Sequence, residues 1–208
     1  MDKSEKFWDS RADKYEEGYR KYEPNFIKTL EKTKKHLTKE DIVLDFACAT
    51  GVIACDISYH VNRVHGIDIS SNMIDLARIN KKDSGAENIT FERATIADIQ
   101  NKNGSYDVVL AFNIIHLLKH TPEVIQQFNE LLKPGGLLIT TTPCRTGKTS
   151  FSNILLFFLS KAGIVPYLKM FKPTELEKLI INGNFQLIES ENLNGTPPNH
   201  FIVAKKSL

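Results

Sequence analysis

Short apolar runs alternate with helical patterns from residue 41 onward, and this alternation constrains the fold more than any other feature of the chain. Five runs read as strands, at 41–47, 63–69, 88–94, 106–113 and 137–142. The nearly continuous apolar run at 106–113 is typical of a central parallel strand covered on both faces. Strand–helix alternation of this kind predicts an α/β fold with right-handed crossovers, namely a Rossmann-like, doubly wound, mostly parallel sheet with helices on both faces.

Helix boundaries and the last strands complete this prediction. Ser70 or Ser71 can cap the helix after the second strand, and Thr121-Pro122 has the pattern of a cap followed by proline at the first helical position. The helical pattern after Pro122 stops at 133–136, and a later helix is expected to end at Gly183. The runs FQLIESENL and HFIVAKK then predict a strand pair. We therefore expect seven strands, with an antiparallel strand at the C-terminus.

A chain of 208 residues builds one sizeable core, so we expect a single domain over 1–208. Its expected parts are N-terminal helices (1–40), a nucleotide-binding core (41–143), an apolar lid or substrate insertion (144–171), and a closing helix and strand pair (172–208).

Charge, cysteine content and hydropathy exclude several classes of protein. The net charge of +2 is too small to indicate a nucleic-acid partner, and three cysteines fit neither a disulfide framework nor a metal pattern, so no metal is expected. The N-terminus lacks the apolar core of a signal peptide. The run at 154–159 is far shorter than the roughly 20 residues of a membrane span. We expect a cytoplasmic protein with reduced thiols and no stable membrane insertion.

The segment VLDFACATG (43–51) is the candidate ligand loop, because ligands of open α/β sheets bind at the carboxyl ends of the strands. A dinucleotide fingerprint counted from Ala47 would need small residues at Ala49 and Val52, and valine does not fit. The alternative spacing gives Ala47, Ala49 and Gly51, which are all small. Asp68 ends the second strand, where a carboxylate can accept hydrogen bonds from ribose hydroxyls. The loop therefore favours a nucleotide ligand over a dinucleotide.

This loop resembles the first motif of class I S-adenosylmethionine-dependent methyltransferases, whose usual form is VLDxGxGxG. Further segments look like other parts of the family: FWDSRADKYEEGY (7–19), GIDIS (66–70), YDVVLAFNIIHLL (106–118), ELLKPGGLLITTTP (130–143) and MFKPTELEKLIINGNFQLIE (170–189). In this order and spacing they cover nearly the whole chain. The resemblance implies S-adenosylmethionine as cofactor and S-adenosylhomocysteine as product.

The resemblance also implies roles for individual residues. Ala47, Ala49 and Gly51 would pack against the methionine part of the cofactor, with Asp45 anchoring the loop. Asp68 would bind both ribose hydroxyls. Thr95 stands where an acid usually accepts from the adenine amine, and Asp98 is a substitute for it. The remaining expected cofactor contacts are Tyr15, Phe46, Ile69, Met73, Ile96 and Asn113, with Ile69 and Met73 flanking the adenine and Asn113 near the transferable methyl.

Alanine at 47 and 49 leads to a backbone prediction. Alanine tolerates positive φ poorly, so we expect ordinary backbone angles at Ala47 and Ala49, with a special conformation at Gly51 alone.

His116 is the candidate general base, just past the fourth strand. A base is needed only where the acceptor must lose a proton before attack. The alternative is that the ring of His116 packs among Ile115 and Leu117 without a chemical role.

The segment 144–171 is the least family-like part of the chain and is rich in apolar and aromatic residues. One hypothesis makes it a lid over a small hydrophobic methyl acceptor, with candidate contacts at Phe7, Trp8, Phe151, Phe158 and Tyr167. The alternatives are a cap over the protein's own core or a dimer contact. Either a monomer or a homodimer is compatible with this.

Two other functions compete with a methyltransferase. Gly147-Lys148-Thr149 is typical of a phosphate-binding loop, but position 142 is threonine where that motif requires glycine. A stronger rival is a methyltransferase-like domain with a degraded loop that binds cofactor weakly and serves as a regulatory subunit.

Overall fold

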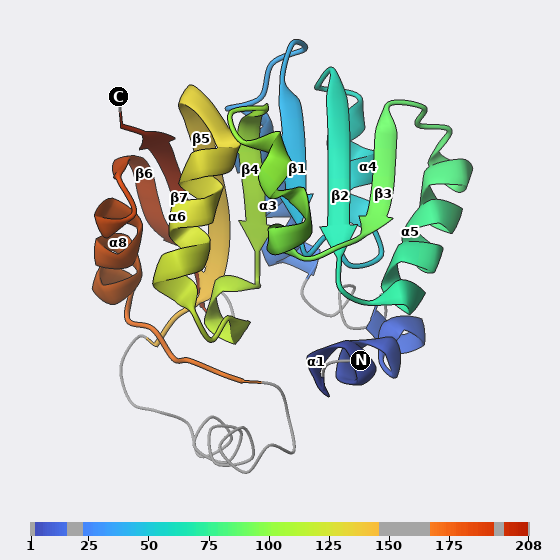
Figure 1. Ribbon diagram of the computed structural model, residues 1–208, viewed down its shortest axis with the longest axis horizontal. Helices are drawn as coiled ribbons and strands as arrows, with labels where there is room; N and C mark the ends of the chain where they lie inside the picture. Colours follow the sequence, from blue (N-terminus) through green and yellow to red (C-terminus); the bar gives the residue numbers. More distant parts are fainter. Residues whose placement is uncertain (1–2, 16–22, 146–166, 194–197, 208) are drawn as a thin grey trace.

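A computed structural model describes residues 3–15, 23–145, 167–193 and 198–207 (Figure 1). Its centre is a seven-stranded sheet in the order β3-β2-β1-β4-β5-β7-β6. The strands are β1 (Ile42–Phe46), β2 (Arg63–Asp68), β3 (Ile89–Arg93), β4 (Tyr106–Phe112), β5 (Leu132–Pro143), β6 (Phe185–Leu193) and β7 (Asn199–Lys206). The strands β1 to β5 are parallel, whereas β7 pairs antiparallel with β5 and with β6. The expected fold class is confirmed.

Helices cover both faces of the sheet. They are α1 (Lys3–Asp9), α3 (Glu23–Lys34), α4 (Val52–Ser58), α5 (Ser71–Ser84), α6 (Thr121–Leu131) and α8 (Pro173–Asn182), with 3-10 turns η1 (Ile96–Lys102) and η2 (Ile115–Leu117). Side chains from α3, α4 and α5 share one buried cluster, and side chains from η1, α6 and α8 share another. None of the helices among the described residues is long and apolar enough to cross a membrane.

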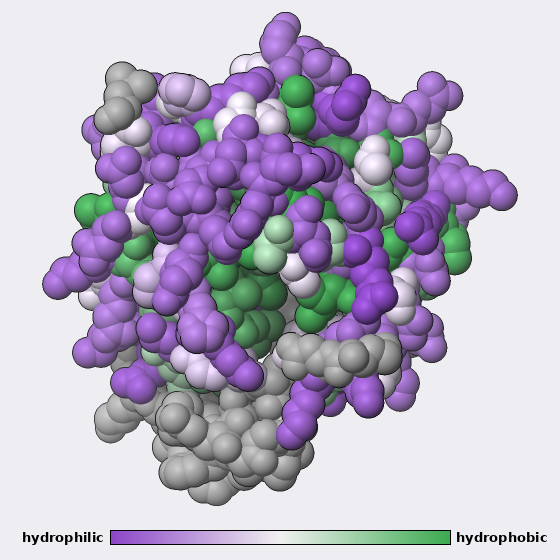
Figure 2. All heavy atoms as spheres, in the orientation of Figure 1, coloured by the Kyte–Doolittle hydropathy of each residue, from purple (hydrophilic) through white to green (hydrophobic). Residues whose placement is uncertain are grey.

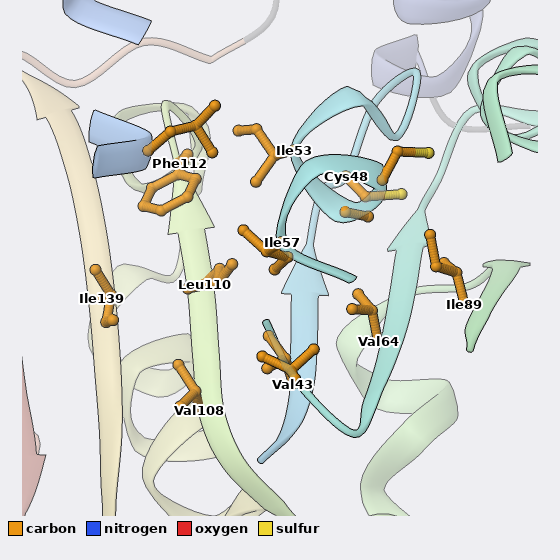
Figure 3. Close-up of a cluster of buried hydrophobic side chains, with 14 of the residues drawn as sticks. Val43, Cys48, Ile53, Ile57, Val64, Ile89, Val108, Leu110, Phe112 and Ile139 are labelled. Carbon is orange, nitrogen blue, oxygen red and sulfur yellow. The ribbon is translucent and has the colours of Figure 1, made fainter. Parts of the chain in front are cut away.

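The two core clusters follow from the alternation of side chains along each strand. Along β4, Val108 and Leu110 point to the α3–α4–α5 face, while Val109 and Ala111 point to the opposite face. Figure 3 shows the first cluster, where side chains of β1, β2, β4 and α4 converge. Because both faces are buried, β4 is almost continuously apolar, as its sequence indicated.

Two local expectations were wrong by small amounts. The helix α6 begins at Thr121 and is preceded by His120, so Thr121 lies inside the helix and its hydroxyl donates to the carbonyl of Leu118. The strand expected at 137–142 is longer, because β5 begins directly after α6 at Leu132 and ends at Pro143. The helix α8 ends at Gly183, as expected; Gly183 has an ordinary φ of −82°, and the residue after it, Asn184, adopts the left-handed conformation with φ 65°.

The order of the strands places a ligand site at one edge of the sheet. β1 lies between β2 and β4, so the chain moves outward in one direction through β2 and β3 and then returns to the other side of β1. Ligands of open α/β folds bind beyond the carboxyl ends of the strands at this reversal. In Figure 1 the arrowheads of β1 to β4 end at the lower edge, beside α1. Figure 2 shows hydrophobic residues in a recess near this edge, surrounded by mostly hydrophilic surface.

Candidate functional site

Two adjoining cavities open at the carboxyl edge of the sheet. The smaller has a volume of about 270 Å³ and the larger about 670 Å³. Trp8, Tyr15, Phe112 and Asn113 line both, so the two cavities share one wall. Two connected compartments suit a reaction in which a cofactor and a second molecule must meet.

The smaller cavity contains most of the residues that sequence analysis assigned to a cofactor. Eight of these residues line it: Tyr15, Phe46, Ala47, Ala49, Asp68, Ile69, Met73 and Asn113. The structure therefore brings together residues of β1, β2, β4 and α5 with the N-terminal segment, although they are far apart in the sequence. Their roles toward a cofactor remain predictions.

The loop after β1 has an unusual backbone. Ala47 has φ 59°, Ala49 has φ 47° and Gly51 has φ 73°, so the expectation of ordinary angles at the two alanines was wrong. An L-residue in this conformation costs about 1–2 kcal/mol, because its Cβ crowds the following carbonyl oxygen. Tertiary hydrogen bonds offset this strain. The amide of Cys48 donates to Ile67 across 3.0 Å, and the amide of Ala49 donates to Oδ2 of Asp68 across 3.1 Å.

Gly51 serves packing in this loop. A Cβ at Gly51 would lie 2.4 Å from Cζ of Phe91 and 2.9 Å from Cβ of Ala77. Phe91 also fills the space next to Gly66, where a Cβ would lie 2.6 Å from its ring. Gly51 is absent from the described lining of both cavities, so the expected contact with the methionine part of the cofactor is not seen. The absence of a side chain at Gly51 instead lets α4 and α5 pack closely against β3.

Asp68 is the acid that ends β2, and it is buried. Oδ1 of Asp68 accepts from the amide of Ser70 across 2.9 Å, while Oδ2 accepts from Ala49. Burial raises the pKa of Asp68, and the amides of Ser70, Ala49 and Ile69 act against this shift. A carboxylate has about four acceptor positions, so Asp68 keeps capacity for hydroxyl donors on the cavity side.

Asp45 is the second buried acid of the site. It lines a narrow crevice of about 10 Å³ together with Tyr15, Ala47 and Ala49. Its Oδ2 is buried and has no hydrogen-bond partner among the described residues. Burial, and secondly the charge of Asp68, raises the pKa of Asp45 to about 7. A buried acceptor without a partner is rare, and it indicates a position where a ligand cation or donor would be stabilised.

The segment after β3 departs from expectation. Ala94 lines the smaller cavity, but Thr95, Ile96 and Asp98 are absent from its described lining. Asp98 is exposed and caps the turn η1, since its Oδ2 accepts from the amide of Thr95 at 2.8 Å and from the hydroxyl at 2.7 Å. These two hydrogen bonds lower the pKa of Asp98. The idea that Asp98 replaces the missing acid of the third motif is therefore not supported.

Asn113 lies at the wall between the cavities, directly after β4, with φ 54°. Its Oδ1 accepts from Nδ2 of Asn199 at 3.3 Å. Oδ1 of Asn199 is buried and lacks a partner among the residues described. The larger cavity therefore contains a second unpaired acceptor, next to the shared wall.

The helix α1 is fastened over the smaller cavity at both ends. Glu5, which is buried, forms an ion pair with Arg93 of β3. Oδ1 of Asp9 accepts from the hydroxyl of Ser70 across 2.6 Å and from the amide of Asn72 across 3.3 Å. The side chains between these anchors include Trp8, which lines both cavities. The N-terminal segment thus forms part of the site.

His116 lies in η2 and lines neither cavity as described, so its role as a general base stays a prediction. Its Nδ1 is buried without a partner in the described part of the chain. Burial lowers the pKa of His116 to about 4, so the ring is neutral at pH 7. Its carbonyl accepts from the amide of Lys169 across 2.8 Å. The alternative of a packed side chain in η2 fits better.

The residues expected to contact the methyl acceptor divide into three groups. Trp8 and Tyr167 line the smaller cavity. Phe7 lines neither cavity within the described residues; its ring packs edge-on against Trp8 and lies under the guanidinium of Arg11 at 4.1 Å. Phe151 and Phe158, like Gly147-Lys148-Thr149, lie outside the residues that the structure describes. The lid hypothesis for 144–171 stays a prediction.

Most of the larger cavity was not found from the sequence. The residues missed are Ser10, Arg11, Lys14, Asn25, Phe26, Thr29, Ile53, Phe112, Thr141, Pro143 and Asn199. They come from the N-terminal segment, α3, α4, β4, β5 and β7. The strand ends in the sequence could have pointed to some of these residues, because Phe112, Pro143 and Asn199 lie at strand termini along one edge of the sheet. Of the described residues, no group of three or more acids, histidines or cysteines is arranged to hold a metal ion.

Comparison with known proteins agrees with this geometry. A family model described as "Methyltransferase domain" matches residues 37–170, which is more than half of the chain. Ubiquinone biosynthesis O-methyltransferases of Bartonella bacilliformis and Nitrosococcus oceani are 27% and 28% identical over 76% and 74% of this chain. The chain spans only 64% and 65% of their lengths. A solved SAM-dependent methyltransferase from Methanosarcina mazei has a TM-score of 0.69 at 20% identity, covering 84% of this chain and 96% of its own.

Proposed function

The chain belongs to the methyltransferase-domain family, and from this premise we propose that it transfers a methyl group from S-adenosylmethionine to a small molecule held in the larger cavity. The cofactor supplies an activated methyl group on a positively charged sulfur. The acceptor's lone pair displaces that sulfur in line, so a new bond to the methyl carbon forms as the carbon–sulfur bond breaks, leaving S-adenosylhomocysteine.

Asp68 carries the cofactor assignment. A buried carboxylate at the end of β2, with acceptor positions still available beside the smaller cavity, suits the two hydroxyls of a ribose. Asp45 adds a second fit, because its unpaired Oδ2 would be satisfied by an ammonium group. The alanines at 47 and 49 present little side-chain bulk to the cavity.

The protein's contribution to the reaction would be mainly placement. Holding two reactants in line and excluding water can contribute about 7–11 kcal/mol. Asn113, Trp8 and Tyr15 stand where the two cavities meet, so we assign to them the alignment of acceptor and methyl group. No titratable side chain of the described shared wall other than Tyr15 is available to take a proton. A readily ionised or uncharged nucleophile would suit such a site.

For the cell compartment and the oligomeric state we keep the expectations drawn from the sequence. All three cysteines are free and buried, which suits a reducing compartment such as the cytoplasm. We propose a cytoplasmic enzyme that acts as a monomer or homodimer.

Isothermal titration with S-adenosylmethionine and S-adenosylhomocysteine tests the cofactor assignment. We expect both to bind, and we expect Asp68→Asn to weaken binding by roughly tenfold or more, since hydrogen bonds to a charged group contribute about 1.5–3 kcal/mol. Asp75→Asn is the matched control, because Asp75 is an exposed acid of α5 that pairs with Arg78. Absence of binding to the wild-type protein at millimolar ligand would contradict the proposal.

A second experiment separates an enzyme from a regulatory cofactor-binding subunit. The protein is incubated with methyl-labelled cofactor and a metabolite extract, and the products are identified by mass. An enzyme yields a labelled small molecule, and at a cofactor concentration near the wild-type Kd its amount is lower with Asp68→Asn. Tight cofactor binding without any labelled product would favour the regulatory alternative.

A further inference from the structure

The larger cavity differs from the smaller one in the charge of its lining. Its charged lining residues, among those the structure describes, are Arg11 and Lys14, and no aspartate or glutamate is present. The smaller cavity is lined by both an acid, Asp68, and a base, Lys119, and the narrow crevice beside the two cavities contains Asp45. The charged lining of the larger cavity is therefore of one sign only, and a positive lining suits an anionic ligand.

Arg11 and Lys14 have no acid within ion-pair distance among the residues that the structure describes. Neither forms an ion pair with any residue in the described part of the chain. The guanidinium of Arg11 lies 4.1 Å from the ring centre of Phe7, a cation–π contact that holds it in place without cancelling its charge. Both side chains are exposed, so they stand at the entrance of the cavity and present two positive charges there.

The inner wall of the same cavity combines apolar side chains with the buried threonines Thr29 and Thr141, and it includes an unpaired acceptor. Phe112 and Ile53 are buried beneath it, and Phe26 lies alongside them. Oδ1 of Asn199 is buried and unpaired, while Nδ2 of Asn199 is bonded to Asn113 at the wall shared with the smaller cavity. An acceptor in this position calls for a hydroxyl or amine donor from a ligand.

We propose that the larger cavity binds an amphipathic organic anion as the methyl acceptor, with its anionic group on Arg11 and Lys14, its apolar body against Phe112 and Ile53, and its hydroxyl or amine on Asn199. This rests on the proposed methyltransferase function and deepens it by naming the acceptor class. The hydroxyl or amine would then be the methylated group, because Asn199 adjoins the wall where the two cavities meet. Its proton would be released to solvent as the new bond to the methyl carbon forms. Arg11 and Lys14 are specificity-determining residues in this proposal.

Two fluorescent probes of the same shape test the charge requirement. 8-Anilinonaphthalene-1-sulfonate has an apolar ring system, an amine and an anionic group, and N-phenyl-1-naphthylamine is its uncharged counterpart. Both are titrated into protein saturated with S-adenosylhomocysteine, so that the smaller cavity is filled. We expect the sulfonate to bind about tenfold more tightly than the uncharged probe, as charge-assisted hydrogen bonds are the stronger ones. Equal affinities would overturn the proposal.

Substitutions identify the residues involved. Arg11→Gln combined with Lys14→Gln should weaken binding of the sulfonate about tenfold and leave the affinity for the uncharged probe unchanged. Lys6→Gln with Lys3→Gln is the matched control, since these lysines carry the same charge on α1 and line neither cavity as described. Equal losses with both pairs would reduce the effect to overall charge and overturn the assignment.

Failure of this inference can be told apart from failure of the proposed function. The Arg11 and Lys14 variant should bind S-adenosylhomocysteine like the wild-type protein, because neither residue lines the smaller cavity. If the cofactor binds and the probes are not distinguished, only the acceptor class is wrong. If the wild-type protein does not bind the cofactor at all, the methyltransferase function itself fails.

Discussion

The amide of Ala49 donates a hydrogen bond to Oδ2 of Asp68 across 3.1 Å, which ties the loop after β1 to the end of β2. The same carboxylate accepts from Ser70 at the start of α5. Asp68 therefore organises the site before any ligand binds: it fixes the strained loop at one oxygen and the helix start at the other. Its free acceptor positions face the smaller cavity, where the ribose is proposed to bind.

Ala49→Gly should be tolerated and should leave cofactor affinity within about twofold of wild type. Ala49 has φ 47°, and glycine removes a strain of about 1–2 kcal/mol at such a position. The greater freedom of glycine in the unfolded chain offsets about 0.4–1 kcal/mol of that gain. We expect the free energy of unfolding in urea to stay equal or to rise slightly.

Ala54→Gly is the matched control for Ala49→Gly. Ala54 is a buried residue inside α4 with ordinary helical geometry, so glycine there should lower the unfolding free energy by about 1 kcal/mol or more. A similar loss at both positions would show that the positive φ at Ala49 stores no strain.

Gly51→Ala should be strongly destabilising, because the new Cβ would lie 2.4 Å from Phe91. Gly85→Ala isolates the backbone contribution: Gly85 has φ 70°, but nothing lies within 4 Å of its added Cβ. We expect a loss of about 1 kcal/mol for Gly85→Ala and at least about 1–3 kcal/mol more for Gly51→Ala from overpacking. Chemical unfolding of both variants measures the difference.

The double variant Gly51→Ala with Phe91→Leu sharpens this prediction. Removing the ring relieves the clash, so the double variant should lose less stability than the sum of the two single changes. Strictly additive losses would mean that Phe91 is not what excludes a side chain at Gly51.

Asp45 makes the free energy of unfolding fall as the pH rises, whereas an acid stabilised by an ion pair makes it rise. Its pKa is raised to about 7 in the folded protein, so the folded state holds a proton that the unfolded state releases near pH 4. The resulting stabilisation is present below pH 4 and is lost as the pH rises to 7. Asp45→Asn removes this dependence, so the stability of the variant relative to wild type should rise between pH 4 and pH 8, by at most about 4 kcal/mol.

Unfolding in urea at several pH values measures this difference, with Asp75→Asn as an exposed control. Asp45→Asn should also weaken cofactor binding if Asp45 faces the ammonium group of the cofactor. In that case the wild-type affinity should increase from pH 5.5 to pH 7.5 as Asp45 ionises, whereas the affinity of Asp45→Asn should not. A variant that is neither stabilised at pH 8 nor weakened in binding would contradict both parts.

Asp9→Asn should loosen α1 and accelerate cofactor release. Oδ1 of Asp9 accepts from the hydroxyl of Ser70 at 2.6 Å and from Asn72, and loss of its charge weakens both contacts. We expect a severalfold higher dissociation rate of S-adenosylhomocysteine in stopped-flow measurements, with little change in melting temperature. Asp13→Asn is the control, because Asp13 is exposed in the same segment. Unchanged release in Asp9→Asn would mean that α1 does not restrain the cofactor.

The sequence alone determined the fold class and the position of the smaller cavity. Apolar periodicity marks strands buried on both faces, and Asp68 and the loop 43–51 must lie together because the carboxyl ends of neighbouring parallel strands share one edge. These features depend on local pattern and on the topology that the pattern imposes.

Only the tertiary structure decided the rest of the site. The left-handed angles of Ala47 and Ala49 run against local preference and are held by partners in β2. The burial of His116 and the gathering of Arg11, Lys14 and Asn199 around one cavity depend on contacts between segments far apart in the chain. Such contacts leave no periodic signal in the sequence, since they arise from how the helices and strands pack against each other.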